Sequence, residues 1–153
     1  MSKMAGTREI KKAAVILALL WMMPSCLNSP PEPVEVAFNE DTCSRCRMAL
    51  SDKSFAAEAV SPDGHVDFFD DIGCLARWLR ERDLAPRTGI FVLDYQEHEW
   101  LNAEAAHYVL SDRLPTPMGY GLAALRSRAA AEKLAANTGA RILTWEQVLG
   151  EAG

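Results

Sequence analysis

Sulfur side chains are concentrated in one short stretch of the chain, where Cys43, Cys46 and Met48 lie within six residues. Thiolate and thioether sulfur are polarizable ligands that favour Cu(I), whereas hard cations prefer carboxylate and carbonyl oxygens. Cys46 and Met48 are two residues apart, so on an extended segment their side chains would point to one face and hold one ion together. Cys43 precedes Cys46 by three residues, and a loop or turn would bring its sulfur to the same point. The stretch therefore predicts a soft-metal site, with Cu(I) as the ion that it binds.

The same two thiols also allow other functions. Cys43 and Cys46 could form a disulfide or a redox-active dithiol, which would make the protein an exported thiol-disulfide redox lipoprotein that works without metal. The thioether of Met48 adds nothing to disulfide chemistry, and no thioredoxin-like βαβ pattern surrounds the pair. A third alternative is a structural lipoprotein or a zinc site, although zinc usually takes four Cys or His ligands and fewer cluster here. We therefore favour Cu(I) binding and keep the redox protein as the alternative.

The first 25 residues have the layout of a secretory signal. A basic segment is followed by an uninterrupted apolar stretch at residues 13–23 and then by Pro24, Ser25 and Cys26. These eleven apolar residues would span about 16 Å as a helix, well short of the roughly 30 Å hydrocarbon core, so a permanent membrane span is disfavoured. A small residue followed by Cys resembles the bacterial lipobox, which predicts lipidation of Cys26 and stable anchoring by its acyl chains. The alternative is an ordinary secreted protein in which Cys26 pairs or stays free.

Removal of residues 1–25 changes both the charge and the cysteine count. It takes away four basic residues and one acidic residue, so the net charge falls from −5 to about −8. Such a surface repels phosphate backbones and argues against nucleic-acid binding. With Cys26 acylated, three cysteines remain, and an odd number leaves at least one thiol unpaired within the chain even in an oxidising compartment. No catalytic triad, phosphate loop or paired-carboxylate site is evident, so we do not expect an enzyme.

The rest of the chain predicts an α+β fold. Residues 26–33 contain several prolines and should form an extended tether. A Pro-Asp-Gly turn between two apolar-rich runs predicts a hairpin, which is followed by a helix capped by Asp70 or Asp71 and by a further strand. These four elements are expected at residues 55–60, 65–69, 72–82 and 90–95. The first unit, residues 34–97, therefore has the order ββαβ.

The second half repeats this order more faintly. Two strands, an Ala-rich helix that Gly139 would end, and a third strand are expected at residues 106–110, 120–125, 127–137 and 141–143. Thr144 and Gln147 have capping-box spacing for a short final helix through Leu149. Residues 98–153 thus form a second ββαβ unit. The predicted organisation is a lipoprotein signal peptide at 1–25, a tether at 26–33 and two small ββαβ units.

Four features occur in one order along the chain, and together they resemble the NosL family of copper-binding accessory lipoproteins of nitrous oxide reductase. They are the lipobox, the Cys-x-x-Cys-x-Met motif, residues 68–74 and residues 117–119. The resemblance implies two ββαβ units in a NosL/MerB-like fold, Cu(I) binding, and help in assembling the copper-sulfide centre of the reductase during denitrification. It also implies nitrous oxide reductase and an ABC-type membrane complex as partners. The expected location is a lipid-anchored position facing the periplasm, on the outer membrane.

The resemblance also bears on the metal ligands. Family motifs commonly have glycine between the second cysteine and the methionine, where this chain has Arg47, a bulky cation beside the sulfur pair. Met118 stands between a proline and a glycine in the second unit. An isolated methionine is more often a gap-filling core residue, but the resemblance favours Met118 as a ligand supplied across the two units. The predicted metal ligands are thus Cys46, Met48, Met118 and Cys43.

Two other groups of candidates are less favoured. Cys74 follows a glycine at the start of the first predicted helix, where it could be an extra thiol ligand, although a small buried apolar residue is the better interpretation. The three histidines lie far from the sulfur motif in the sequence, and we expect structural or surface roles for them. One histidine could still complete a copper site from a distance. These histidines are His65, His98 and His107.

Overall fold

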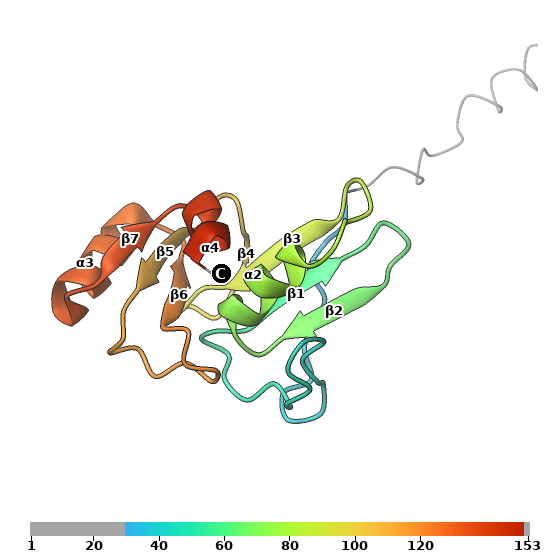
Figure 1. Ribbon diagram of the computed structural model, residues 1–153, viewed down its shortest axis with the longest axis horizontal. Helices are drawn as coiled ribbons and strands as arrows, with labels where there is room; N and C mark the ends of the chain where they lie inside the picture. Colours follow the sequence, from blue (N-terminus) through green and yellow to red (C-terminus); the bar gives the residue numbers. More distant parts are fainter. Residues whose placement is uncertain (1–29, 152–153) are drawn as a thin grey trace, which may run out of the picture.

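The computed structural model describes residues 30–151 and shows two small sheets side by side with helices packed against them (Figure 1). The predicted signal peptide and the predicted lipidation site Cys26 lie outside the described residues. Within residues 30–151, no helix is both long enough and apolar enough to span a membrane. The predicted α+β class is confirmed, because strands and helices follow one another in the predicted ββαβ order twice.

The first sheet has the order β2-β1-β3-β4, and every neighbouring pair is antiparallel. Its elements are β1 (Ala57–Val60), β2 (Val66–Phe69), helix α2 (Ile72–Arg80), β3 (Gly89–Leu93) and β4 (Trp100–Asn102). The predicted hairpin is present, with Val60 opposite Val66 at its closed end. The apolar face of α2 packs on this sheet and buries Ile72, Leu75 and Ala76. One face of the sheet is thereby removed from water.

Strand β4 belongs to the first sheet although it lies beyond the predicted unit boundary at residue 97. Its three residues pair with the last three residues of β3. The turn between them is held by Asp94, whose carboxylate accepts hydrogen bonds from the backbone N–H groups of Gln96 (2.7 Å) and Glu97 (2.8 Å). A strand of three residues is too short for period-two alternation to be evident, so the sequence pattern missed it. The boundary between the units therefore falls after Asn102.

The second sheet has the order β6-β5-β7. Its elements are β5 (His107–Leu110), β6 (Leu122–Leu125), helix α3 (Arg128–Thr138), β7 (Arg141–Leu143) and helix α4 (Trp145–Glu151). Helix α3 begins where the Ser127 side chain accepts a hydrogen bond from the N–H of Ala130, and it ends at Gly139 with a left-handed φ of 66°. Thr144 and Gln147 exchange the two hydrogen bonds of the predicted capping box.

The two units are fused through their cores. One cluster of buried side chains contains residues of both units, and α2 packs against α4. The N–H of Tyr95 donates to the carbonyl of Ala124 at 2.8 Å, so the chain leaving β3 runs alongside β6. The second carboxylate oxygen of Asp94 accepts from the N–H of Arg126 at 2.7 Å. A site can therefore be built with residues from both units in fixed positions.

The described end of the predicted tether lies against the first sheet. Residues 30–37 have no regular secondary structure, as expected for a segment rich in proline. The N–H of Val34 donates to Oε1 of Glu58 on β1 at 2.8 Å, and Pro31 lies beside Gly89 on β3. The predicted tether, residues 26–33, therefore does more than separate the folded part from a membrane, because Pro31 lies against β3 and the next segment is bound to β1 through Val34.

Candidate metal centre

The sulfur motif forms a closed loop between residues 39 and 50. The N–H of Asn39 donates to the carbonyl of Leu50 (2.8 Å), and the N–H of Cys43 donates to the carbonyl of Met48 (2.8 Å). Inside this loop Arg47 has a left-handed φ of 66°. Cys46 and Met48 therefore lie on a tight turn, and the predicted extended arrangement is wrong. The prediction that a turn would bring the Cys43 sulfur close to Cys46 is confirmed, because the N–H of Cys46 lies 3.5 Å from the Cys43 Sγ.

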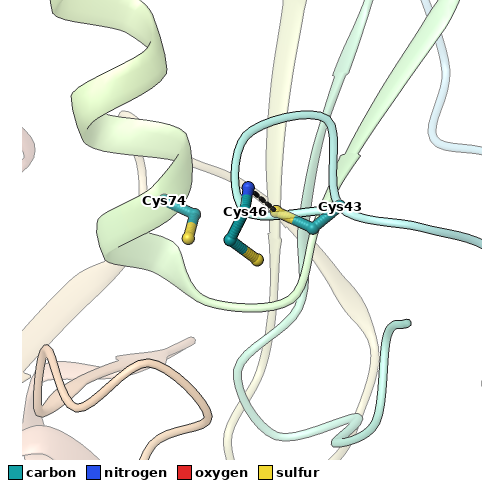
Figure 2. Close-up of side chains that lie close together, drawn as sticks. All are labelled: Cys43, Cys46 and Cys74. Carbon is teal, nitrogen blue, oxygen red and sulfur yellow. Dashed lines mark hydrogen bonds between the residues drawn. The ribbon is translucent and has the colours of Figure 1, made fainter. Parts of the chain in front are cut away.

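Three thiols meet at this turn. The Sγ atoms of Cys43, Cys46 and Cys74 all lie within 4.8 Å of one another. Figure 2 shows Cys74 projecting from α2 toward the loop that holds the other two cysteines. Cys43 and Cys74 are fully buried, whereas Cys46 is partly exposed. The cluster therefore opens to solvent on the side of Cys46.

Cys74 is the thiol of this cluster whose position the sequence did not predict. It is buried, as expected, but its sulfur also joins the other two thiols. The residue lies 31 positions after Cys43, and no spacing rule connects a loop to a helix at that separation. The odd number of thiols that the predicted lipidation of Cys26 would leave was the one available signal, because a third thiol outside any disulfide needs a metal or a buried position.

Several hydrogen bonds bring α2 and the loop together. The Asp71 side chain caps the helix by accepting from the N–H of Gly73 at 2.8 Å, which sets the first turn that holds Cys74. The N–H of Ser44 donates to the carbonyl of Phe68 (2.8 Å), at the end of β2 just before the helix. At the other end of α2, Arg45 forms an ion pair with Glu81 at 2.9 Å. The loop is thus attached near both ends of the helix.

The thiols differ in how readily they lose a proton. A hydrogen bond from Cys74 and backbone N–H groups, including that of Cys46, lower the pKa of Cys43, although burial opposes them. The same hydrogen bond to Cys43 raises the pKa of Cys74, and burial adds to this effect. Burial raises the pKa of Cys46. Cys43 is therefore the thiol that loses its proton most readily, and a soft cation can replace the protons that the thiols hold.

The two candidate methionines are exposed. The Met48 side chain is 59% exposed and that of Met118 is 41% exposed, so Met118 is not a core residue. The N–H of Met118 donates to Oδ2 of Asp71 at 3.1 Å, which holds its loop at the start of the helix that contains Cys74. Tyr120 packs directly on Gly73 in the same place. The loop of the second unit thus lies against the first turn of α2, and thioether coordination by Met48 and Met118 stays a prediction.

The histidines lie elsewhere. His65 pairs with Asp67 at 3.4 Å, and the His98 ring lies 3.3 Å from the Ser54 hydroxyl. His107 is a partly buried residue of β5. In the part of the chain that the structure describes, the group of side chains that could hold a metal consists of cysteines only. The three histidines therefore lie at the structural and surface positions that we expected.

The fold and the site together define a class: a small α+β protein of two fused ββαβ units, with a cluster of three thiols between the sulfur loop and α2. The chain belongs to the NosL family, whose model matches residues 33–152. The predicted resemblance is confirmed.

Two relatives illustrate the match. The chain is 28% identical over 123 residues to the copper-binding lipoprotein NosL of Stutzerimonas stutzeri, covering 74% of this chain and 65% of that protein. It therefore spans slightly less than two thirds of that relative. In three dimensions it is similar to the crystal structure of the copper chaperone NosL from Shewanella denitrificans, with a TM-score of 0.66, 17% identity, and coverage of 77% of this chain and 96% of that one. At this identity the structural likeness concerns the fold.

Proposed function

We propose that the protein is a membrane-anchored Cu(I)-binding metallochaperone that delivers copper for assembly of the copper-sulfide centre of nitrous oxide reductase. The observation that supports this most is the group of three sulfur atoms within 4.8 Å, of which one, Cys46, reaches solvent. Thiolates select soft ions. The exposed thioethers of Met48 and Met118 have the same preference for soft ions. Copper is the cargo of this protein and not a catalytic cofactor, so we expect no enzymatic activity.

The proposed partners follow from the family. They are nitrous oxide reductase and an ABC-type membrane complex, both on the periplasmic side. The relative from Stutzerimonas stutzeri is named a lipoprotein, which supports lipidation of Cys26 and a position on the periplasmic face of a membrane, with the outer membrane as the proposed one. The acidic chain would favour partners with basic docking faces and would repel nucleic acid.

The redox alternative is less well supported by the geometry. A dithiol that exchanges disulfides needs a nucleophilic thiolate that its partner can reach. Cys43, the thiol with the lowered pKa, is fully buried, and the accessible thiol, Cys46, has a raised pKa because of burial. A metal ion, being small, can enter such a cluster where a protein disulfide cannot.

The test is an anaerobic Cu(I) competition titration of the purified, reduced protein against a strong chromophoric chelator. Cys46→Ser should weaken Cu(I) binding by at least about tenfold, because Cys46 is the thiol that links the buried sulfurs to the surface. The matched control is Ser44→Ala, which alters the same turn without removing sulfur. Equal affinity in Cys46→Ser and the wild type would refute the metallochaperone. In that case the reduction potential of Cys43 and Cys46 becomes the decisive measurement.

A further inference from the structure

We infer that Cu(I) has two positions in this protein that share Cys46: an inner one with Cys43 and Cys74, and an outer one with Met48. The inner position retains the ion, and the outer one presents it to the acceptor. This inference rests on the proposed function, since it concerns how the same cargo is held and released. In this inference Cys74 is a ligand that holds the resting Cu(I). Met48 binds the ion only while it is being transferred.

Exposure separates the two positions. Cys43 and Cys74 are fully buried, Cys46 is partly buried, and Met48 is 59% exposed. All three thiols lie within 4.8 Å of one another, so an ion among them can reach two or three sulfurs with small side-chain rotations. Met48 is only two residues from Cys46, on the far side of the left-handed turn at Arg47. The ligands are therefore ordered from interior to surface with Cys46 in the middle.

The inner position is prepared for negative charge. The Cys43 sulfur accepts a hydrogen bond from the backbone N–H of Cys46 at 3.5 Å, and a donor aimed at the sulfur favours its anionic form. Arg45 lies in the same loop, between Cys43 and Cys46, and its guanidinium pairs with Glu81 at 2.9 Å. Its Nε is buried and has no hydrogen-bond partner within residues 30–151. A cluster of thiolates around one Cu(I) is net negative, so these positive groups would stabilise the loaded state.

The outer position is not prepared for negative charge. Thioether sulfur is neutral and binds Cu(I) without losing a proton, so Met48 adds no charge. Its exposure lets a sulfur ligand of an acceptor approach the same ion. An ion held by Cys46 and Met48 is therefore less tightly bound and easier to reach than one held by three cysteines.

Movement between the positions is ligand exchange without redox chemistry. Cys46 stays bound throughout. The bonds from copper to Cys43 and Cys74 break, the Cys74 sulfur takes up a proton from water and donates it in a hydrogen bond to the Cys43 sulfur, and a bond from copper to the Met48 sulfur forms. Copper remains Cu(I) at every stage, so no oxidant or reductant is needed. An acceptor ligand then replaces Met48 and finally Cys46.

Two variants separate retention from transfer. Cys74→Ala replaces a buried thiol with a slightly smaller apolar side chain, and Met48→Leu replaces an exposed thioether with an apolar side chain of similar size. Both are measured anaerobically for Cu(I) affinity by chelator competition and for the rate of Cu(I) transfer to excess chelator by stopped flow. Cys74→Ala should weaken affinity by about tenfold or more and speed transfer. Met48→Leu should keep affinity within about threefold and slow transfer by about tenfold.

X-ray absorption of the loaded wild type provides a readout that does not depend on a variant folding. The resting ion should show thiolate ligands only, since Met48 binds during transfer. Thioether coordination in the resting protein would overturn the inference, as would unchanged affinity in a folded Cys74→Ala variant. Failure of the wild type to bind Cu(I) at all would instead refute the proposed function. Tight binding by the wild type together with normal affinity in Cys74→Ala would leave that function standing and remove only the inner position.

Discussion

The carboxylate of Asp71 joins the two units, because its Oδ2 accepts a hydrogen bond from the backbone N–H of Met118 at 3.1 Å. Its other oxygen, Oδ1, accepts from the N–H of Gly73 at 2.8 Å and caps α2. One buried side chain therefore sets both the first turn of the helix that holds Cys74 and the position of the Met118 loop. The thiol cluster and the second unit are placed relative to each other by this residue.

Asp71→Asn should destabilise the protein by about 1–3 kcal/mol. Both carboxylate oxygens accept hydrogen bonds from N–H groups, whereas an amide has one oxygen and would turn its NH₂ group toward one of these donors. Urea denaturation measures the change in the free energy of unfolding. The exposed Asp112→Asn is the matched control and should be neutral. Equal stabilities for the two variants would show that Asp71 does not join the units as described.

Gly73→Ala should also destabilise the protein, although alanine is a better helix former than glycine. A Cβ at this position would lie 2.1 Å from the Tyr120 Cγ, so the ring and the loop that follows Met118 would have to move. We expect the free energy of unfolding to fall by about 1–3 kcal/mol, as measured by thermal unfolding. Tyr120→Ala should relieve the clash, so the double variant should lose less than the sum of the two single variants. If the losses of the two single variants simply added in the double variant, the direct contact between Gly73 and Tyr120 would be contradicted.

Arg47 occupies a backbone conformation that glycine adopts without strain. Its φ of 66° costs a residue with a side chain about 1–2 kcal/mol, while glycine loses about 0.5–1 kcal/mol through its more flexible unfolded chain. Arg47→Gly should therefore be at least as stable as the wild type. Arg47→Val should be less stable by about 1 kcal/mol, because a β-branched residue is poorly tolerated at positive φ. Chemical denaturation of the three proteins tests this order, and a valine variant as stable as the glycine variant would contradict it.

Glu58 should make stability depend on pH. Burial raises its pKa from 4.5 to about 7, against the hydrogen bond that its Oε1 accepts from Val34. The folded protein then holds this proton more tightly than the unfolded chain does. The stabilisation that the raised pKa of Glu58 provides is fully present below about pH 4.5 and is lost as the pH rises through 7. The free energy of unfolding should fall by at most about 3 kcal/mol over this range.

Glu58→Gln keeps an acceptor for the Val34 N–H but cannot ionise. The variant should therefore be more stable than the wild type at pH 8 and nearly equal to it at pH 4.5, which urea unfolding at both values measures. The difference in the free energy of unfolding between the variant and the wild type removes the contribution of all other titrating groups, because both proteins share them. Parallel stability curves for wild type and variant would contradict the raised pKa.

Much of the fold follows from local pattern. The Pro-Asp-Gly turn, the Gly139 cap and the Thr144 capping box each act over a few residues, and each occurs as predicted. The choice between Asp70 and Asp71 as the first helix cap did not follow from pattern, because both precede the helix. Asp71 caps it, and Asp70 instead accepts from the N–H of Ser51 at 2.7 Å. Which carboxylate caps the helix depended on a partner 19 residues away in the sequence.

The sequence by itself determined the kind of chemistry and the order of the elements, because ligand softness and hydrophobic period are properties of residue types and short spacings. It predicted Cys43, Cys46 and Met48 as soft ligands, and it predicted two ββαβ units. Only the tertiary structure decided that Cys74 completes a three-thiol cluster and that Asp71 holds the Met118 loop beside it. Those contacts join residues 31 and 47 positions apart, and the packing of α2 against the sulfur loop and the second unit, not any repeat in the chain, brings them together.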